Sequence, residues 1–379
     1  MAEGPLAGLL VVDLTRVLAG PFATMMMADL GARVVKVERP GRGDDSRAYG
    51  PFVDGRSTYF ARVNRGKESV ALDLRDPADR AVLLALAARA DVLVENFRPG
   101  VMDRLGLGAD ALTAAHPRLV YASVSGFGQT GPWRERPAYD TVVQAAAGLF
   151  AVTGEPAGAP VKMGTSIADL TAGLYAFGAI LAALRGRDAT GRGGRVDVAM
   201  FDAALSLLEG AALHWLARGT EPPRLGDQHP SISPFGSFRC ADAPVVVCAA
   251  NDGLFGVLCA VLGRPRLVGD PRFADNAGRV AHRDALTAEL EAALADGPAA
   301  GWLERLGAAG VPCSAVSGVG AALDSEQAAA RRMVVRAGGL AMPGNPMKIA
   351  PYADPADRPG PPALDEHGAA VRAELGLAP

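Results

Sequence analysis

Asp169 is the residue best suited by its type and position to covalent chemistry. It directly precedes an apolar run, residues 170–184, which predicts a buried helix with the aspartate at its N-terminus. An aspartate in this position most often serves as a helix N-cap. The two roles are compatible, because helix dipoles keep a carboxylate ionised and an ionised carboxylate is a nucleophile at neutral pH. Gly164 and Gly173, on either side, predict room for a substrate to approach.

A second set of candidates consists of arginines that follow short apolar runs. They are Arg39, Arg75, Arg98 and Arg104. Ligands of open parallel sheets bind at the carboxyl ends of the strands, and guanidinium groups match the geometry of phosphate oxygens. Each arginine alone is more simply explained as a solvated surface residue. As a set at strand ends, they predict a site for a phosphorylated nucleotide.

The elements that must position these residues alternate between strand and helix. Continuous apolar runs predict strands covered on both faces, and the segments between them predict helices. The strands are expected at 9–14, 33–38, 69–74, 91–95, 119–124 and 196–199, and the helices at 22–30, 80–88, 99–105, from 139, from 169 and at 201–216. Residues 19–21 are expected to form a turn. This order predicts an α/β fold with a large, doubly wound, mainly parallel sheet.

The second part of the chain predicts a smaller α+β domain. A Pro-rich polar stretch at 221–233 marks the crossing into it, and a strand at 245–249 precedes helices at 254–262, 284–295 and 299–309. Many prolines and glycines at 338–362 indicate a return to the first domain. We therefore expect a large Rossmann-like domain with the nucleotide site at 1–220, a small domain at 221–330 and a segment at 331–379 that returns to the large domain.

Composition narrows the class of protein. Hydrophobic residues make up 49% of the chain, charged residues 21%, and the net charge is -3, which argues against a nucleic-acid partner. No secretory signal is expected at the start, and the apolar run before Arg185 is shorter than a bilayer-spanning helix. The four cysteines have no metal-ligand spacing. These features predict a cytoplasmic protein without metal, disulfides or a membrane partner.

A dinucleotide site is the weaker alternative for the nucleotide. Glu38 ends the second predicted strand, where an acidic residue binds the ribose of NAD in Rossmann folds. The phosphate-binding fingerprint needs three glycines, however, and residues 15–21 contain one. The arginine set therefore favours a nucleotide other than NAD.

Several short segments, in order along the chain, carry a resemblance to a known family. They are 16–21, 28–32, 36–41, 95–100, 104–106, 121–128, 168–169, 190–193 and 310–313. On these segments the chain resembles the class III CoA-transferases, which include formyl-CoA transferase and, as a sister branch, alpha-methylacyl-CoA racemase. The resemblance implies transfer of CoA from an acyl-CoA, such as succinyl-CoA, to a carboxylic acid. It also implies no permanently bound cofactor, and a homodimer whose two chains interlock.

The resemblance also implies site residues. Asp169 aligns with the aspartyl nucleophile, which forms a mixed anhydride and then a CoA thioester. Tyr59 matches a substrate-pocket tyrosine, and His229 is a candidate contact for the acceptor acid. The residues expected along CoA are Val17, Leu18, Arg39, Leu72, Asp73, Leu74, Arg75, Asn96, Phe97, Arg98, Arg104, Ala138 and Tyr139.

Two alternatives to a CoA-transferase stay open, an acyl-CoA racemase or epimerase and a CoA-binding protein without catalysis. Tyr139 stands where the racemases carry a histidine base, which favours the transferase. Leu18 replaces a glutamine of formyl-CoA transferase, and residues 226–234 replace its glycine-run lid. These two departures make oxalate and formate unfavoured as substrates.

Overall fold

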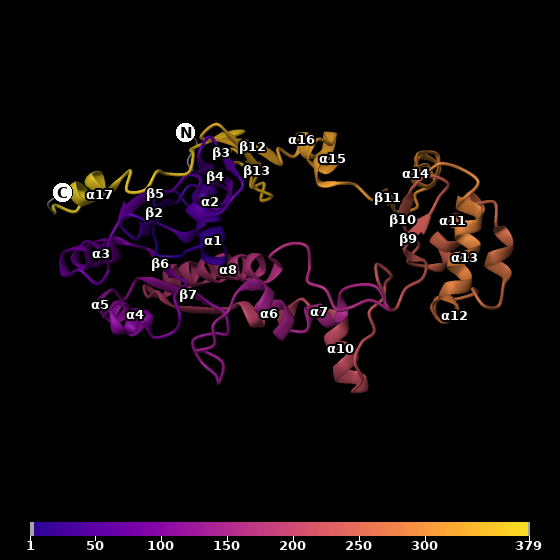
Figure 1. Ribbon diagram of the computed structural model, residues 1–379, viewed down its shortest axis with the longest axis horizontal. Coiled ribbons are helices and arrows are strands. Elements are labelled where there is room, and N and C mark those ends of the chain that lie inside the picture. The colour runs from indigo at the N-terminus through magenta and orange to yellow at the C-terminus, as the bar shows by residue number, and fades with distance from the viewer. Residues whose placement is uncertain (1–3, 378–379) are drawn as a thin grey trace. The chain divides into compact units, whose positions relative to one another are not determined.

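The computed structural model describes residues 4–377 and divides into two compact units (Figure 1). The first unit contains the described residues up to Leu149, Lys162–Leu208 and those from Leu323 onward. The second unit contains Phe150–Val161 and Glu209–Ala322. Residues 150–161 and 209–220, expected in the large domain, thus belong to the second unit.

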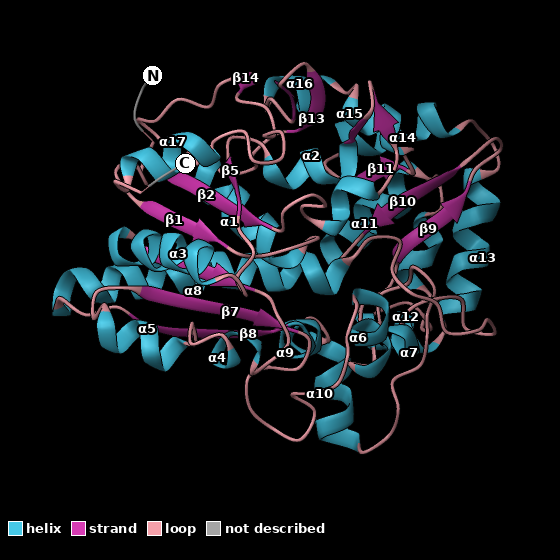
Figure 2. Ribbon diagram, turned by 60° about the vertical axis from the view of Figure 1, so that its left-hand side comes forward, coloured by secondary structure: helices cyan, strands magenta, loops and turns pink. Residues whose placement is uncertain are grey.

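A six-stranded parallel sheet forms the centre of the first unit (Figure 2). Its order is β5-β2-β1-β6-β7-β8, so the chain starts in the middle and winds outward in both directions. The strands are β1 (Leu10–Asp13), β2 (Arg33–Glu38), β5 (Glu68–Ala71), β6 (Val92–Glu95), β7 (Val120–Ser125) and β8 (Gly194–Ala199). The α/β fold with a large parallel sheet, expected from the alternating pattern, is confirmed.

Helices cover both faces of this sheet because successive strand residues point to opposite sides. Val11 packs in one buried cluster and Val12 in the other. The first cluster includes side chains of α1 (Ala19–Asp29), α6 (Asp140–Ala146), α8 (Ile167–Thr190) and α9 (Met200–Ser206). The second includes side chains of α3 (Pro77–Arg89), α4 (Val101–Arg104), α5 (Ala109–Ala115) and α17 (Gly368–Glu374).

Two predicted helix boundaries differ from the structure. Residues 19–21, expected as a turn, form the first turn of α1, where the missing N–H of Pro21 breaks no helical hydrogen bond. The single helix expected at 201–216 is instead two helices, α9 and α10 (Glu209–Arg218), which fall in different units. Of the described helices, α8 is long and apolar enough to cross a membrane, and it packs on α1, α9 and β8 as a core helix does.

The first unit also contains short elements beside the sheet. Between β2 and β5 lie η1 (Asp45–Ala48), β3 (Phe52–Val53), β4 (Arg56–Ser57) and α2 (Thr58–Asn64). After α16 (Glu326–Ala330), the strands β12 (Val334–Ala337), β13 (Leu340–Pro343) and β14 (Asp357–Arg358) form a small sheet in the order β13-β12-β14. The chain then runs along β5, where the backbone N–H of His367 donates to the Ser69 carbonyl at 2.9 Å.

The second unit has its own core of helices on an antiparallel sheet. The sheet order is β11-β10-β9, with β9 at Phe235–Arg239, β10 at Pro244–Cys248 and β11 at Cys313–Ala315. Its helices are α10, α11 (Asp252–Val261), η2 (Pro265–Gly269), α12 (Asn276–Ala281), α13 (Arg283–Leu294) and α14 (Ala299–Ala308). Two short helices, α7 (Leu149–Val152) and α15 (Val319–Leu323), lie where the units divide.

Candidate active site

A cavity of about 490 Å³ lies at the carboxyl ends of β1, β2, β5 and β6. Ligands of doubly wound sheets bind at this edge, where the strand order reverses direction. Of the residues expected along CoA, seven line the cavity, namely Arg39, Leu72, Asp73, Leu74, Arg75, Phe97 and Arg104. The structure thus brings together residues from three loops that are far apart in the sequence.

The three predicted arginines that line this cavity are exposed. Arg39 follows β2, Arg75 follows β5 and Arg104 belongs to α4. Arg75 forms an ion pair with Asp73 at 3.1 Å. Arg98 does not line the cavity and borders a smaller one that also contains Glu95 and Tyr121. Of the four predicted arginines, three therefore line the main cavity, and Arg98 lies outside it.

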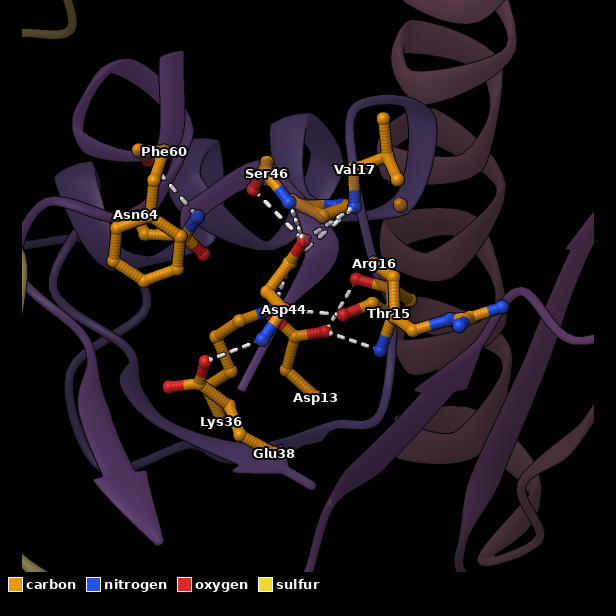
Figure 3. Close-up of polar contacts among 12 residues, drawn as sticks. Asp13, Thr15, Arg16, Val17, Lys36, Glu38, Asp44, Ser46, Phe60 and Asn64 are labelled. Atoms are coloured by element: carbon orange, nitrogen blue, oxygen red, sulfur yellow. Dashed lines mark hydrogen bonds and ion pairs between the residues drawn. The ribbon is translucent and has the colours of Figure 1, made fainter. Parts of the chain in front are cut away.

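The turn after β1 brings Val17, Leu18 and Asn96 near the site without placing them in the cavity wall. The Asn96 side chain accepts from the Arg16 N–H and donates to the Arg16 carbonyl, both at 2.8 Å. The Val17 N–H donates to the Asp44 carboxylate at 3.1 Å, and Val17 has a φ of 68° (Figure 3). Leu18 is buried. These contacts hold a left-handed turn that a β-branched residue rarely adopts.

A network of buried charges lies below this turn (Figure 3). The Lys36 Nζ lies 2.9 Å from Asp44 Oδ2 and donates to the Thr15 carbonyl at 2.7 Å. The Lys67 Nζ lies 2.9 Å from Asp13 Oδ2. Burial alone would raise the pKa of Asp13, but the charges of Lys67 and Lys36 outweigh it and hold that pKa well below its ordinary range. Burial lowers the pKa of Lys67 to about 8.

Glu38, the residue on which a dinucleotide site would depend, is occupied by protein partners. Its carboxylate pairs with Arg47 at 2.6 Å and accepts from Ser69 Oγ at 2.7 Å and from the Asp44 N–H at 2.9 Å. A carboxylate that accepts this many hydrogen bonds has little capacity left for a ribose hydroxyl. The geometry therefore does not support the NAD alternative.

Asp169 lies in the first turn of α8, two residues after the first helical residue. The Asp140 carboxylate, not that of Asp169, accepts the N–H groups of Ala168 and Asp169, at 2.9 and 3.2 Å. The expectation that Asp169 caps the helix is therefore wrong. Asp140 takes this role because α6, which it begins, packs against α8.

The protonation of Asp169 also differs from the expectation. Its side chain is half-buried, and burial raises its pKa to about 7, with a further rise from the charge of Asp140. Arg62 opposes this rise without cancelling it. The helix dipole does not keep the group fully ionised at neutral pH, because desolvation and a like charge outweigh it.

The two glycines beside Asp169 have different surroundings. A Cβ on Gly164 would meet no atom within 4 Å, which agrees with room for a substrate. A Cβ on Gly173 would lie 2.7 Å from the Ala19 carbonyl oxygen. Gly173 therefore permits the close packing of α8 on α1, and the expectation that it leaves room for substrate is wrong.

Tyr59 and Arg62 both lie on α2 and interact electrostatically with Asp169. Burial raises the pKa of Tyr59, the charge of Arg62 lowers it, and the charge of Asp169 raises it. The Arg62 guanidinium lies 4.3 Å from the centroid of the Tyr59 ring, and the Tyr49 ring packs edge-on against Tyr59 at 5.5 Å. Tyr49, Tyr59 and Arg62 thus form a cluster, of which Tyr59 and Arg62 interact electrostatically with the carboxylate of Asp169.

The remaining predicted residues lie apart from this cluster or at its margin. Tyr139 precedes Asp140, and its side chain is 76% exposed, while Ala138 packs near Gly126. His229 belongs to the second unit, where its ring contacts Phe235 at 5.1 Å and its Nδ1 accepts from the Ser231 N–H at 3.1 Å. The described residues contain no group of three or more metal-ligating side chains.

Sequence analysis did not identify Arg62, Asp140 or the Lys36–Asp44 pair. Arg62 follows Tyr59 by three residues, so helical spacing would have placed both on one face of α2. Asp140 directly follows the predicted Tyr139. The Lys36–Asp44 ion pair has no sequence signal, because a loop folds back over the end of β2 to form it.

The fold and the site together define a class. The protein is an α/β protein with a doubly wound parallel sheet, a cationic cavity at the switch point of that sheet and a half-buried carboxylate at a helix N-terminus. Such a cavity suits a phosphorylated ligand, and such a carboxylate suits nucleophilic chemistry.

Comparison with known proteins gives the family. The chain belongs to CoA-transferase family III, whose model matches residues 6–368. It is 52% identical over 374 residues to the acetyl-CoA:oxalate CoA-transferase of Acetobacter aceti, covering 98% of this chain and 96% of that protein. It is 37% identical over 377 residues to the human succinyl-CoA:glutarate CoA-transferase, covering 98% and 86%. The CoA-transferase family and its transferase branch, expected from the motifs, are confirmed.

A third relative and a solved structure agree. The succinyl-CoA:mesaconate CoA-transferase of Haloarcula hispanica is 44% identical over 297 residues, which are 76% of this chain and 74% of that protein. A CAIB/BAIF family protein from Brucella suis superposes with a TM-score of 0.87 and 41% identity, covering 98% of this chain and 100% of that one. The expected enzyme class, a transferase of acyl-CoA metabolism, is thus confirmed.

Proposed function

We propose that this CoA-transferase moves CoA from an acyl-CoA to a short dicarboxylic acid, with Asp169 as the covalent carrier. The relatives reported above are named for oxalate, glutarate and mesaconate, all of which are dicarboxylic acids. Leu18 and residues 226–234 made oxalate an unfavoured substrate in the sequence analysis. We include it as a candidate acceptor because the Acetobacter relative is named for it.

The proposed chemistry begins with the Asp169 carboxylate attacking the thioester carbonyl of the donor. The C–S bond breaks, which releases the CoA thiolate and leaves a mixed anhydride of Asp169 and the acyl group. The thiolate then attacks the aspartyl carbonyl, so that the donor acid leaves and an aspartyl-CoA thioester remains. The acceptor carboxylate repeats the two steps in reverse and departs as the new acyl-CoA. The thioester energy is retained throughout, so no other energy source is needed.

One observation carries this proposal, the environment of Asp169. The carboxylate is half-buried beside Tyr59, and its pKa of about 7 places it at the balance of charged and neutral forms near neutral pH. A desolvated carboxylate is a stronger nucleophile than a hydrated one, because fewer hydrogen bonds must break before it attacks. Strongly perturbed carboxyl groups in clefts are common at catalytic sites.

The cavity supports the proposed binding of CoA. Arg39, Arg75 and Arg104 present guanidinium groups there, which suits the phosphates of the ADP half of CoA. Leu72, Leu74 and Leu105 supply apolar wall for the adenine. Val17, Leu18 and Asn96, expected along CoA, would then act on the site through the turn that Asn96 and Asp44 hold.

The interlocked homodimer remains part of the proposal. Helix α10 has no buried residue, and Leu213, Trp215 and Leu216 on it are 66%, 49% and 79% exposed. Leu174 and Tyr175 on α8 are also about half exposed. Apolar side chains of this size on helices usually find a partner, and a second copy of the chain would cover them.

The test separates chemistry from binding. Asp169→Ala is expected to bind CoA as the wild type does but to lose transfer by a factor on the order of 10³ or more, because the covalent path is gone. Hydroxylamine with acyl-CoA should inactivate the wild type only, by trapping the aspartyl thioester. The matched variant Arg104→Met should instead weaken CoA binding about tenfold and leave the trapping chemistry intact. Full transfer by Asp169→Ala would exclude the proposed mechanism.

A further inference from the structure

Two arginines of the first unit, Arg62 and Arg65, differ sharply in their partners. Arg65 is buried and forms an ion pair with Asp29 at 2.6 Å. Arg62 enters none of the ion pairs formed among residues 4–377, although it is half-buried. Its Nε atom is buried and has no hydrogen-bond partner. A half-buried cation without an anion is costly, because it gives up hydration and gains no charge partner.

Arg62 is directed to the candidate active site by its own helix. It lies one turn after Tyr59 on α2, and its guanidinium covers the Tyr59 ring at 4.3 Å. Helix α2 packs on α1, and α1 packs on α8, which carries Asp169. The charge of Arg62 therefore reaches Asp169, yet the two groups form no ion pair. A small acyl group that reacts at Asp169 would thus lie near the charge of Arg62.

The chemistry of the proposed substrates suggests a binding role for the Arg62 guanidinium. When Asp169 attacks the carbonyl of an acyl group, or receives the attack of an acceptor, the rest of that molecule must extend away from the aspartate. A dicarboxylic acid would place a second carboxylate at the far end of this chain. A guanidinium group matches a carboxylate with two parallel hydrogen bonds, which a neutral chain end cannot form.

We propose that Arg62 binds the second carboxylate of a dicarboxylic substrate while the first carboxyl carbon reacts at Asp169. The inference rests on the proposed function and adds a residue that selects the substrate class. Selection follows from desolvation, because a monocarboxylic acid would leave the half-buried Arg62 guanidinium against an apolar chain end. Arg62 and the Tyr59 ring thus form a recognition surface for the substrate tail.

A competing role for Arg62 is to hold the Tyr59 ring in place by stacking. The two roles differ in what they predict. A stacking role would affect every acid alike, since Tyr59 adjoins the site whichever acid is bound. A recognition role would affect only acids that have a second carboxylate.

The test compares glutarate with butyrate as acceptors, with a monocarboxylic acyl-CoA as donor. The wild type is expected to prefer glutarate. In Arg62→Met the ratio of kcat/KM for glutarate to that for butyrate should fall about tenfold or more, mainly through the KM for glutarate. Arg62→Lys should restore part of the ratio, because it keeps the charge without the fork. Arg118→Met, an exposed arginine near the N-terminal end of β7, should leave the ratio unchanged.

The outcomes separate the inference from the proposed function. An equal fall in both kcat/KM values, or a wild type that shows no preference for glutarate, would overturn the role of Arg62. A wild type that transfers CoA to no acid would overturn the proposed function itself. If Arg62→Met does not fold, as judged by circular dichroism, the ratio in Arg62→Lys decides the question.

Discussion

Two aspartates of the first unit have opposite electrostatic environments. Asp13 ends β1 and is fully buried, but it lies against the ammonium of Lys67 and accepts from Thr24 Oγ1 at 2.7 Å. Asp169 is less buried, yet it forms no ion pair in the described part of the chain and faces the carboxylate of Asp140. The pKa of Asp13 is therefore held far below its ordinary range, whereas that of Asp169 is raised to about 7.

The difference shows that pairing, not burial, decides whether a buried carboxylate is held in its charged form. Asp13 accepts hydrogen bonds from Thr24 on α1 and from Lys67. These contacts join β1 to α1 and to the segment that carries Lys67. Asp169 has few donors, so its charge stays available for an electrophile. A buried carboxylate without an ion-pair partner lowers the stability of the fold, and such groups are common at catalytic sites.

The largest effect on stability is expected from Asp13→Asn. The substitution leaves Lys67 without its carboxylate in the core, while Lys36 keeps its ion pair with Asp44, and it should cost about 3–5 kcal/mol in the free energy of unfolding at pH 7. Because the native pKa of Asp13 is lowered, its contribution is fully present above its ordinary pKa of 3.8 and is lost as the pH falls below it. Urea denaturation at pH 7 measures the loss.

The matched control for this effect is the double variant Asp13→Asn with Lys67→Met. It removes the unpaired cation along with the anion, so part of the loss should return. A stability of Asp13→Asn equal to that of the wild type would show that the network does not hold these elements together.

Asp169→Asn should instead raise the free energy of unfolding. The native pKa of about 7 lies above the ordinary 3.8, so the folded protein binds more protons between these values and its stability falls as the pH rises from about 4 to 7. The neutral amide removes this cost. Thermal melting at pH 8 should therefore show a gain of roughly 1–2 kcal/mol over the wild type, and at pH 4 little or none. A loss of stability at pH 8 would contradict the raised pKa.

The smallest effect is expected from Asp140→Asn. The amide oxygen can still accept the N–H groups at the start of α8, but the charge beside Asp169 is gone. The pKa of Asp169 should fall, and because attack needs the carboxylate, the rise of kcat/KM with pH should move down by roughly 0.5–1 pH unit. The pH profile for acyl-CoA measures this shift. An unchanged midpoint would mean that burial alone sets the pKa of Asp169.

Much of the fold was predictable from local patterns. The apolar runs near Val11, Val34 and Val92 are strands because each residue packs in one of two cores, so their hydrophobicity is continuous and easily recognised. The helix expected at 22–30 ends in the structure at Asp29, and Gly31 soon after has a φ of 99°, which suits a residue without a side chain. The break between α9 and α10 was missed, because apolar side chains continue through it.

The sequence by itself determined the α/β class and the family, and it indicated the arginines and Asp169 as candidate site residues. Each of these is carried by residue type, local period or an ordered motif. Only the tertiary structure decided the pKa of Asp169, the capping role of Asp140, the packing role of Gly173 and the buried Nε of Arg62 without a hydrogen-bond partner. These properties depend on distances and on desolvation between segments far apart in the chain. Electrostatic energy follows such distances and burial, which no local pattern of residues contains.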